Sequence, residues 1–369
     1  MRCSASSAPS GLSLDPAPQN PAPGPSGHGR SDAGADGELD PELAWERIGD
    51  ADIRMLRIPT PFAVGRVNTY LIEDDPLTLI DSGPNSGKAL DELERQLGAV
   101  GRRIEEIELI VVTHQHIDHM GLVDIVAKRS GAEVAAIEML APFLAEYSRE
   151  AELDDEFAAG LMLLHGIPED MVIALRAVSH SFRAWGSRAD VTRTLRDGDT
   201  LELAGRKLEV QLRPGHSPTD TLFWDEERRL LLGGDHLLGR ISSNPLLARP
   251  LDGTEQRPRA LLTYLESLRR TRELPAEIVL PGHGDPVTGH AALIDSRVAM
   301  HERRAAKLLE LIRSEPLSAY QLAHSLWGNV AVTQAFLTLS EVVGHMDLLV
   351  ERGEAREVRD GDIVRYSAA

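Results

Sequence analysis

One seven-residue run constrains this chain more than any other feature, because four of its side chains can bind a metal ion. It reads Thr113-His114-Gln115-His116-Ile117-Asp118-His119 and directly follows Leu109-Ile110-Val111-Val112, an apolar run typical of a buried strand. His114 and His116 are two residues apart and can point at one metal. Asp118 and His119 come from the turn that follows and can reach a second metal. Imidazole and carboxylate ligands without thiolate suit zinc, iron or manganese, and zinc is the commonest hydrolytic choice.

Three later residues share the same local setting. His216, Asp235 and His283 each come after an apolar, strand-like run and have glycine as a neighbour, which allows the backbone to approach a crowded site. Seven suitable ligands at four strand ends indicate a binuclear metal site rather than ordinary histidines. The set is complete without His236, for which we expect a structural or substrate-side role. The histidines without comparable partners are expected to be ordinary residues: His165, His180, His290, His301 and His324.

The order His-x-His-x-Asp-His, followed by separate His, Asp and His motifs, resembles the binuclear hydrolase branch of the metallo-β-lactamase fold superfamily over roughly residues 51–297. The resemblance implies an α/β fold, an αβ/βα sandwich with the metals at one edge. It assigns one metal to His114, His116 and His216, and the other to Asp118, His119 and His283. Asp235 would bridge the two metals. Asp81 matches the family's aspartate after the first hairpin and would support the ligands by hydrogen bonds.

Two metal ions that share a water molecule lower its pKa and generate hydroxide as the nucleophile. Asp118 and Asp235 are therefore the candidate catalytic residues beside that hydroxide. True β-lactamases of the family commonly have cysteine at the bridging position, whereas this chain keeps Asp235. Together with the absence of a Gly-x-Ser-x-Gly motif, this favours metal-dependent ester, thioester or phosphodiester hydrolysis over β-lactam hydrolysis or serine catalysis.

Composition and the pattern of apolar residues along the chain predict three parts. Residues 1–45 are rich in Pro, Gly, Ser, Ala and Asp and are expected to form a disordered tail. Residues 46–297 form the catalytic domain, interrupted at about 139–190 by a helical insert. We expect this insert to cover the metals and to form an apolar substrate pocket. The candidate lining residues are Met162, Leu163, Phe182 and Trp185.

Residues 298–369 are predicted to form a small winged-helix domain, with helices followed by a terminal hairpin. Between Ser314 and Glu351 there is no Lys or Arg, so a nucleic-acid-binding role is disfavoured. We expect the domain to pack on the catalytic domain, to shape one wall of the pocket, or to mediate a homodimer. Tyr320, Trp327 and Phe336 would mostly form its core.

Composition narrows the function classes. A formal net charge of −19 argues against a general nucleic-acid surface, and no apolar run is long enough for a membrane helix. A single cysteine and the lack of a secretory signal favour the cytoplasm. The predicted substrate is a small acyl thioester or ester. The alternatives are an endoribonuclease of the winged-helix branch and a metal-binding protein without activity.

Overall fold

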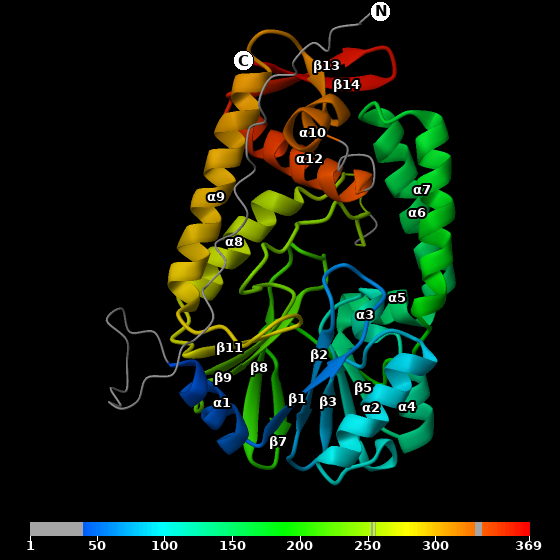
Figure 1. Ribbon diagram of the computed structural model, residues 1–369, viewed down its shortest axis with the longest axis vertical. Coiled ribbons are helices and arrows are strands. Elements are labelled where there is room, and N and C mark those ends of the chain that lie inside the picture. The colour runs from blue at the N-terminus through cyan, green and yellow to red at the C-terminus, as the bar shows by residue number, and fades with distance from the viewer. Residues whose placement is uncertain (1–39, 252–253, 255, 329–333) are drawn as a thin grey trace, which may run out of the picture. The chain divides into compact units, whose positions relative to one another are not determined.

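A computed structural model describes residues 40–251, 254, 256–328 and 334–369. Its centre consists of two β-sheets (Figure 1). The first sheet has the order β1 (Ile53–Ile58), β2 (Val67–Ile72), β3 (Thr78–Ile80), β4 (Leu109–Val112), β5 (Glu133–Ile137) and β6 (Arg193–Leu195). The second has the order β11 (Ile278–Pro281), β10 (Leu230–Gly234), β9 (Thr221–Asp225), β8 (Arg206–Leu212) and β7 (Thr200–Leu203).

The buried strand predicted at Leu109–Val112 is confirmed as β4 of the first sheet. β2 and β3 pair antiparallel with Tyr70 opposite Ile80, and β3, β4 and β5 are parallel neighbours. Inward-facing side chains of both sheets form one hydrophobic core. Along β9, Phe223 belongs to this core while Leu222 and Trp224 belong to a separate cluster, as alternation along a strand requires. Strand β9 is therefore buried on both faces, whereas β7 and β8 expose every second residue along most of their length.

Helices α2 (Gly87–Ala99) and α4 (Val123–Ser130) lie against the first sheet (Figure 1). The side chain of Ser86 caps α2 by accepting a hydrogen bond from the Ala89 amide at 3.1 Å. Leu93 and Leu97 of α2 are fully buried and form the apolar face by which the helix packs. The mixed α/β sandwich expected from the sequence is therefore present.

The first described helix, α1 (Pro41–Asp50), corrects one predicted boundary. The tail was expected to extend to residue 45, but a helix begins at Pro41, with Asp40 capping it through the Glu42 amide at 2.8 Å. Ala44 and Ile48 are buried in the sandwich core, so this segment gains the apolar burial that composition alone did not reveal. Residues 1–39, the rest of the predicted tail, lie outside the described residues.

The helical insert consists of α5 (Ala141–Ala145), α6 (Tyr147–Leu164) and α7 (Glu169–Phe182). Helices α6 and α7 share a second hydrophobic core with α8 (Ala260–Arg272), α9 (His290–Leu311), α10 (Ala319–Trp327) and α12 (Ala335–Glu351), whereas α5 packs into the sandwich core. The His165 ring stacks on that of Tyr366 with centroids 6.0 Å apart, and the Tyr320 amide donates to the His165 carbonyl at 3.2 Å. The insert and the C-terminal segment are thus packed together (Figure 1).

The C-terminal boundary also differs from the prediction. Helix α9 begins at His290 and runs to Leu311, so the predicted division at 297/298 falls inside one continuous helix. After it come β12 (Leu317–Ser318), α10, α12 and the predicted hairpin of β13 (Ala355–Asp360) and β14 (Ile363–Ala368), in a sheet of order β12-β14-β13. This succession fits the predicted winged helix, a designation that stays a prediction. None of the helices in the described part of the chain is long and apolar enough to cross a membrane.

Candidate metal centre

The structure brings all seven predicted ligands to one edge of the sandwich. His114 and His116 follow β4, while Asp118 and His119 lie on the short helix α3 (Ile117–Met120). The other three follow strands of the second sheet: His216 after β8, Asp235 after β10 and His283 after β11. Their ligand atoms gather in two groups, each within 4.8 Å: His114, His116, His216 and Asp235 in one, and Asp118, His119 and His283 in the other.

The carboxylate of Asp235 lies between these two groups. Its Oδ2 is 3.6 Å from His216 Nε2 and 3.4 Å from His283 Nε2, and its Oδ1 is 3.4 Å from His119 Nε2. It therefore contacts histidines of both groups, the position that a bridging ligand requires. Asp118 faces the same nitrogen of His283, with its Oδ2 3.3 Å from Nε2.

Asp81 supports two of the histidines from behind. Its Oδ2 accepts a hydrogen bond from His119 Nδ1 at 2.7 Å and one from Thr113 Oγ1 at 2.8 Å. Thr113 Oγ1 in turn lies 2.9 Å from His114 Nδ1. One buried carboxylate thus orients His119 directly and His114 through the threonine hydroxyl, and both imidazoles keep Nε2 free to bind a metal.

Backbone carbonyls hold two further histidines in the same way. His216 Nδ1 donates to the carbonyl of Asn244 at 3.0 Å, and His283 Nδ1 donates to that of Arg66 at 2.8 Å. His116 is turned the other way, with Nδ1 3.0 Å from His114 Nε2 and 2.9 Å from His216 Nε2. The three facing nitrogens of His114, His116 and His216 are as close together as ligands of one metal are.

These residues fit a pair of metal ions. Two atoms that face the site, His119 Nε2 and Asp235 Oδ1, are buried without a hydrogen-bond partner, a costly arrangement for a protein that held nothing there. The donor set of imidazoles and carboxylates suits zinc, iron or manganese.

The electrostatics of the site separate the histidines into two kinds. Burial, with the neighbouring histidines, holds the pKa of His114 well below its usual value and lowers that of His116 to about 3. Burial also acts to lower the pKa of His119 and His283, but the Asp235 carboxylate more than offsets it. The pKa of His119 is held well above its usual value and that of His283 is raised to about 10. Burial thus dominates the pKa of His114 and His116, whereas the Asp235 carboxylate dominates that of His119 and His283.

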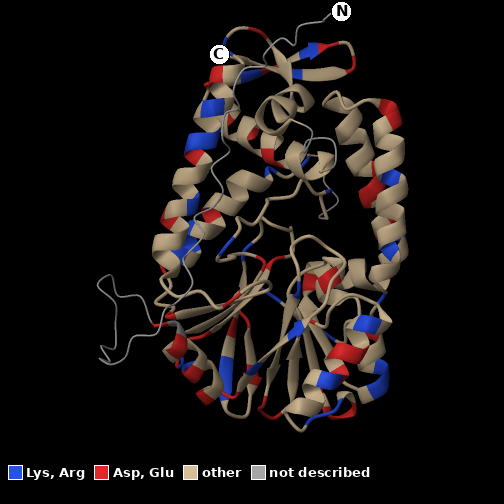
Figure 2. Ribbon diagram, in the orientation of Figure 1, with Lys and Arg blue, Asp and Glu red and all other residues tan. Residues whose placement is uncertain are grey.

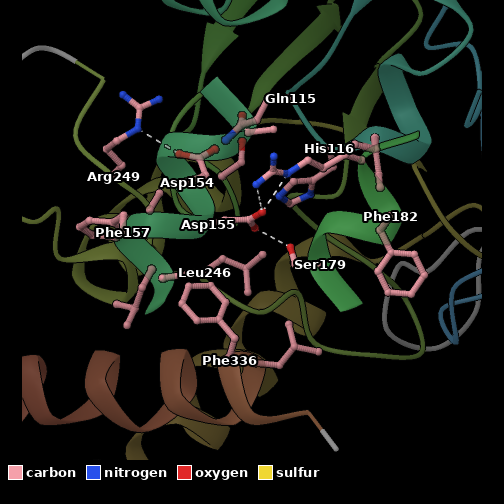
Figure 3. Close-up of a pocket in the computed structure, with 18 of the residues that line it drawn as sticks. Gln115, His116, Asp154, Asp155, Phe157, Ser179, Phe182, Leu246, Arg249 and Phe336 are labelled. Atoms are coloured by element: carbon pink, nitrogen blue, oxygen red, sulfur yellow. Dashed lines mark hydrogen bonds and ion pairs between the residues drawn. The ribbon is translucent and has the colours of Figure 1, made fainter. Parts of the chain in front are cut away.

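A cavity of about 510 Å³ opens beside His116 and His216. Its other walls come from α6, α7, residues 246–251 and the start of α12 (Figure 3). Met162 and Phe182 line it as predicted, whereas Leu163 is exposed and Trp185 lies outside the lining. Gln115 and the 246–251 segment were not singled out from the sequence, because their place in the wall depends on chain segments far from them.

His236 contacts α8 instead of the metal groups. Its Nε2 lies 2.9 Å from Thr271 Oγ1, and its carbonyl accepts a hydrogen bond from the Tyr264 hydroxyl at 2.8 Å. Both contacts fit the structural role expected for it.

A third group of potential ligands lies between α9 and α12: His301, Glu341 and His345. Sequence reasoning treated His301 as ordinary and missed the other two, although Glu341 and His345 are four residues apart on one helix. Arg304 already pairs with the Glu341 carboxylate, and the two imidazoles lie 3.2 Å apart, His301 Nδ1 to His345 Nε2. We interpret the group as a polar contact between helices.

Comparison with known proteins agrees with this geometry. Residues 63–283 match the metallo-beta-lactamase superfamily. The chain is 34% identical over 316 residues to "Probable metallo-hydrolase YqjP" of Bacillus subtilis, which covers 85% of this chain and 97% of that protein. It resembles the crystal structure of a metallo-beta-lactamase family protein from Thermus thermophilus with a TM-score of 0.71 and 28% identity, over 86% of this chain and 99% of that one.

A more distant relative is the "Atrochrysone carboxyl ACP thioesterase" of Aspergillus fumigatus, 25% identical over 138 residues, which are 37% of this chain and 30% of that protein. The superfamily match spans more than half of the chain and includes all seven residues of the two groups. The chain therefore belongs to the metallo-β-lactamase superfamily and is a metallo-hydrolase.

Proposed function

We propose that this protein hydrolyses an acyl thioester or ester with the aid of two zinc ions, which the seven residues of the two groups bind. The observation that carries the proposal is the position of Asp235, whose two carboxylate oxygens face histidines of both groups at 3.4–3.6 Å. When bound, a pair of divalent cations would lower the pKa of a water molecule toward neutrality and polarise the oxygen of the acyl group.

The protein itself orients the metal ligands and encloses the substrate. Asp81, the Asn244 carbonyl and the Arg66 carbonyl each accept a hydrogen bond from one ring nitrogen and so fix the orientation of His119, His216 and His283. Such fixed ligands need no reorganisation during the reaction, which is the condition for electrostatic stabilisation of a developing oxyanion. The cavity beside His116 and His216 would hold the acyl part of the substrate near the site and exclude water from it.

Two observations support an acyl substrate. The cavity wall is mainly aliphatic and aromatic, and side chains of this kind gain free energy by burying hydrocarbon. One distant relative is named as a thioesterase that acts on an acyl group attached to a carrier protein.

A ribonuclease is the competing proposal, because a winged-helix segment was predicted next to a binuclear site. The described helices α10 and α12 contain no Lys or Arg, and Figure 2 shows acidic and basic residues interspersed along the ribbon of α9. Phosphate binding requires clustered positive charge. The charge distribution therefore favours the acyl substrate.

A side-by-side assay tests the choice. The zinc-loaded full-length chain is offered acyl-CoA thioesters, p-nitrophenyl esters, lactones and short RNA, with His114→Ala as the site variant and His324→Ala, at an exposed position on α10, as the control. We expect thioester or ester hydrolysis that the control retains and His114→Ala loses. RNA cleavage that disappears in His114→Ala, without comparable acyl hydrolysis, would overturn the proposal.

A further inference from the structure

The lining of the cavity beside the metal centre bears on which acyl groups the cavity can bind. Its apolar residues come mainly from three parts of the chain: the insert supplies Phe157 and Met162, residues 246–251 supply Leu246, and the start of α12 supplies Phe336 and Leu337. In Figure 3, Phe336 and Phe157 lie across the pocket from His116, with Asp155 between them in the view. The cavity therefore extends away from the metal centre between the insert and the C-terminal segment.

The charged side chains in the wall are paired with one another. Arg183 donates to Asp155 Oδ2 from Nε at 2.9 Å and to Glu152 Oε2 from Nη1 at 2.5 Å, and Ser179 donates to Asp155 Oδ1 at 2.5 Å. Each bond is made within the protein, so this guanidinium is already matched by two carboxylates. It offers little attraction to an anionic group of a ligand.

The second arginine of the wall follows the same pattern. Arg249 donates to Asp154 Oδ1 at 3.1 Å and also pairs with Glu150 (Figure 3 shows the Asp154 contact). Burial raises the pKa of Asp154, with Arg249 acting in the opposite direction. Arg176, which also borders the cavity, lies 3.7 Å from Glu152. In the described part of the wall, each of the three arginines thus has a carboxylate partner, supplied by Asp154 and Asp155 of the lining and by Glu150 and Glu152 just outside it.

From this lining we infer that the cavity binds an uncharged, aliphatic acyl chain and selects substrates by its length, while charged leaving groups stay outside. The inference rests on the proposed function for its link to hydrolysis. A volume of about 510 Å³ is in the range of pockets that enclose ligands of drug size, so the preferred chain has on the order of ten carbons. Each methylene group buried in the cavity should raise kcat/KM roughly fourfold, the equivalent of about 0.8 kcal/mol, until the cavity is full.

The test uses p-nitrophenyl esters of straight-chain acids from two to fourteen carbons with the zinc-loaded full-length chain. Ala158→Phe adds a ring inside the cavity, Phe336→Ala enlarges it, and Ala174→Phe places the same ring on the exposed face of α7 as a matched control. We expect Ala158→Phe to shorten the preferred chain and to lower kcat/KM on the ten-carbon ester at least tenfold more than on the acetate. Phe336→Ala should lengthen the preferred chain, and Ala174→Phe should behave as the wild type.

A second arm tests charge and a third tests binding without catalysis. Replacing the terminal methyl group of the ten-carbon ester by a carboxylate should lower kcat/KM at least 100-fold. Displacement of a fluorescent apolar probe by 1-decanol from the metal-free chain should be weakened by Ala158→Phe.

The outcomes separate the inference from the proposed function. Ester hydrolysis that is independent of chain length, or that tolerates the terminal carboxylate, overturns the inference and leaves the proposed function standing. Displacement by 1-decanol that is weakened by Ala158→Phe, without hydrolysis of any acyl substrate, supports the inference and refutes the proposed function. Absence of displacement by 1-decanol counts against the inference whatever the hydrolysis assay gives.

Discussion

Replacing Gly282 by alanine would place a methyl group inside the metal centre. A Cβ atom at this position would lie 2.2 Å from Asp235 Oδ1 and 2.7 Å from His119 Cε1, whereas real Cβ atoms essentially never approach a neighbour within 3.0 Å. The backbone cannot yield easily. Its amide donates to the Gly234 carbonyl at 2.6 Å, and its carbonyl accepts from the Asn68 amide at 2.6 Å.

The size of the effect follows from these distances. The Asp235 carboxylate would have to retreat by about 0.8 Å to reach even the 3.0 Å limit. A displacement of about 1 Å in a reacting constellation costs on the order of 100-fold in rate, or roughly 2.7 kcal/mol in the activation barrier. Since Asp235 faces both groups, we expect zinc content to fall below two per chain and kcat/KM to fall at least 100-fold.

Metal analysis of the dialysed protein and a kcat/KM measurement at saturating zinc test this. Gly98→Ala is the control, because a Cβ there meets nothing within 4 Å. Far-ultraviolet circular dichroism of both metal-free variants separates a local effect from unfolding. If Gly282→Ala kept two zinc ions and full activity, Asp235 and His119 could not have the positions described, and the reasoning would be refuted.

Three further predictions concern the parts that support the site. Burial lowers the pKa of His165 to about 4, below its value of roughly 6.5 in an unfolded chain. As the pH falls, the unfolded state therefore binds the proton first, and the free energy of unfolding falls by up to about 3 kcal/mol between pH 6.5 and about 4. In denaturant titrations, His165→Gln should flatten this pH dependence. An unchanged slope would contradict the lowered pKa of His165. Arg257→Met should lower the free energy of unfolding by about 3 kcal/mol, because it leaves the buried carboxylate of Asp347 without its two hydrogen bonds of 2.8 and 2.7 Å. Adding Asp347→Leu should recover much of this loss. Asn244→Ala removes the hydrogen bond from Nδ2 to the Leu337 carbonyl at 3.0 Å and so frees the segment whose carbonyl orients His216. Zinc affinity, measured in competition with a chromogenic chelator, should therefore fall about tenfold. Equal affinity would show that α12 does not support the site.

Local patterns were sufficient for much of the fold. Strands such as β4 and the hairpin of β2 and β3 have apolar runs and turn signals within a few residues, and α2 has both an apolar face and a serine cap. Where boundaries failed, distant packing decided the outcome. α1 is held by the sandwich core, and α9 continues through residue 297 without a local signal that would end it.

For the site, the sequence by itself determined the candidate ligands, because each follows a strand and lies in a short motif that can be read without the fold. Only the tertiary structure decided how they are held and what lies beside them. Asn244 is 28 residues from His216, and Phe336 lines the same cavity as Gln115 and Phe157. Contacts between residues so far apart in sequence depend on how whole elements pack, and no periodicity within either segment encodes them.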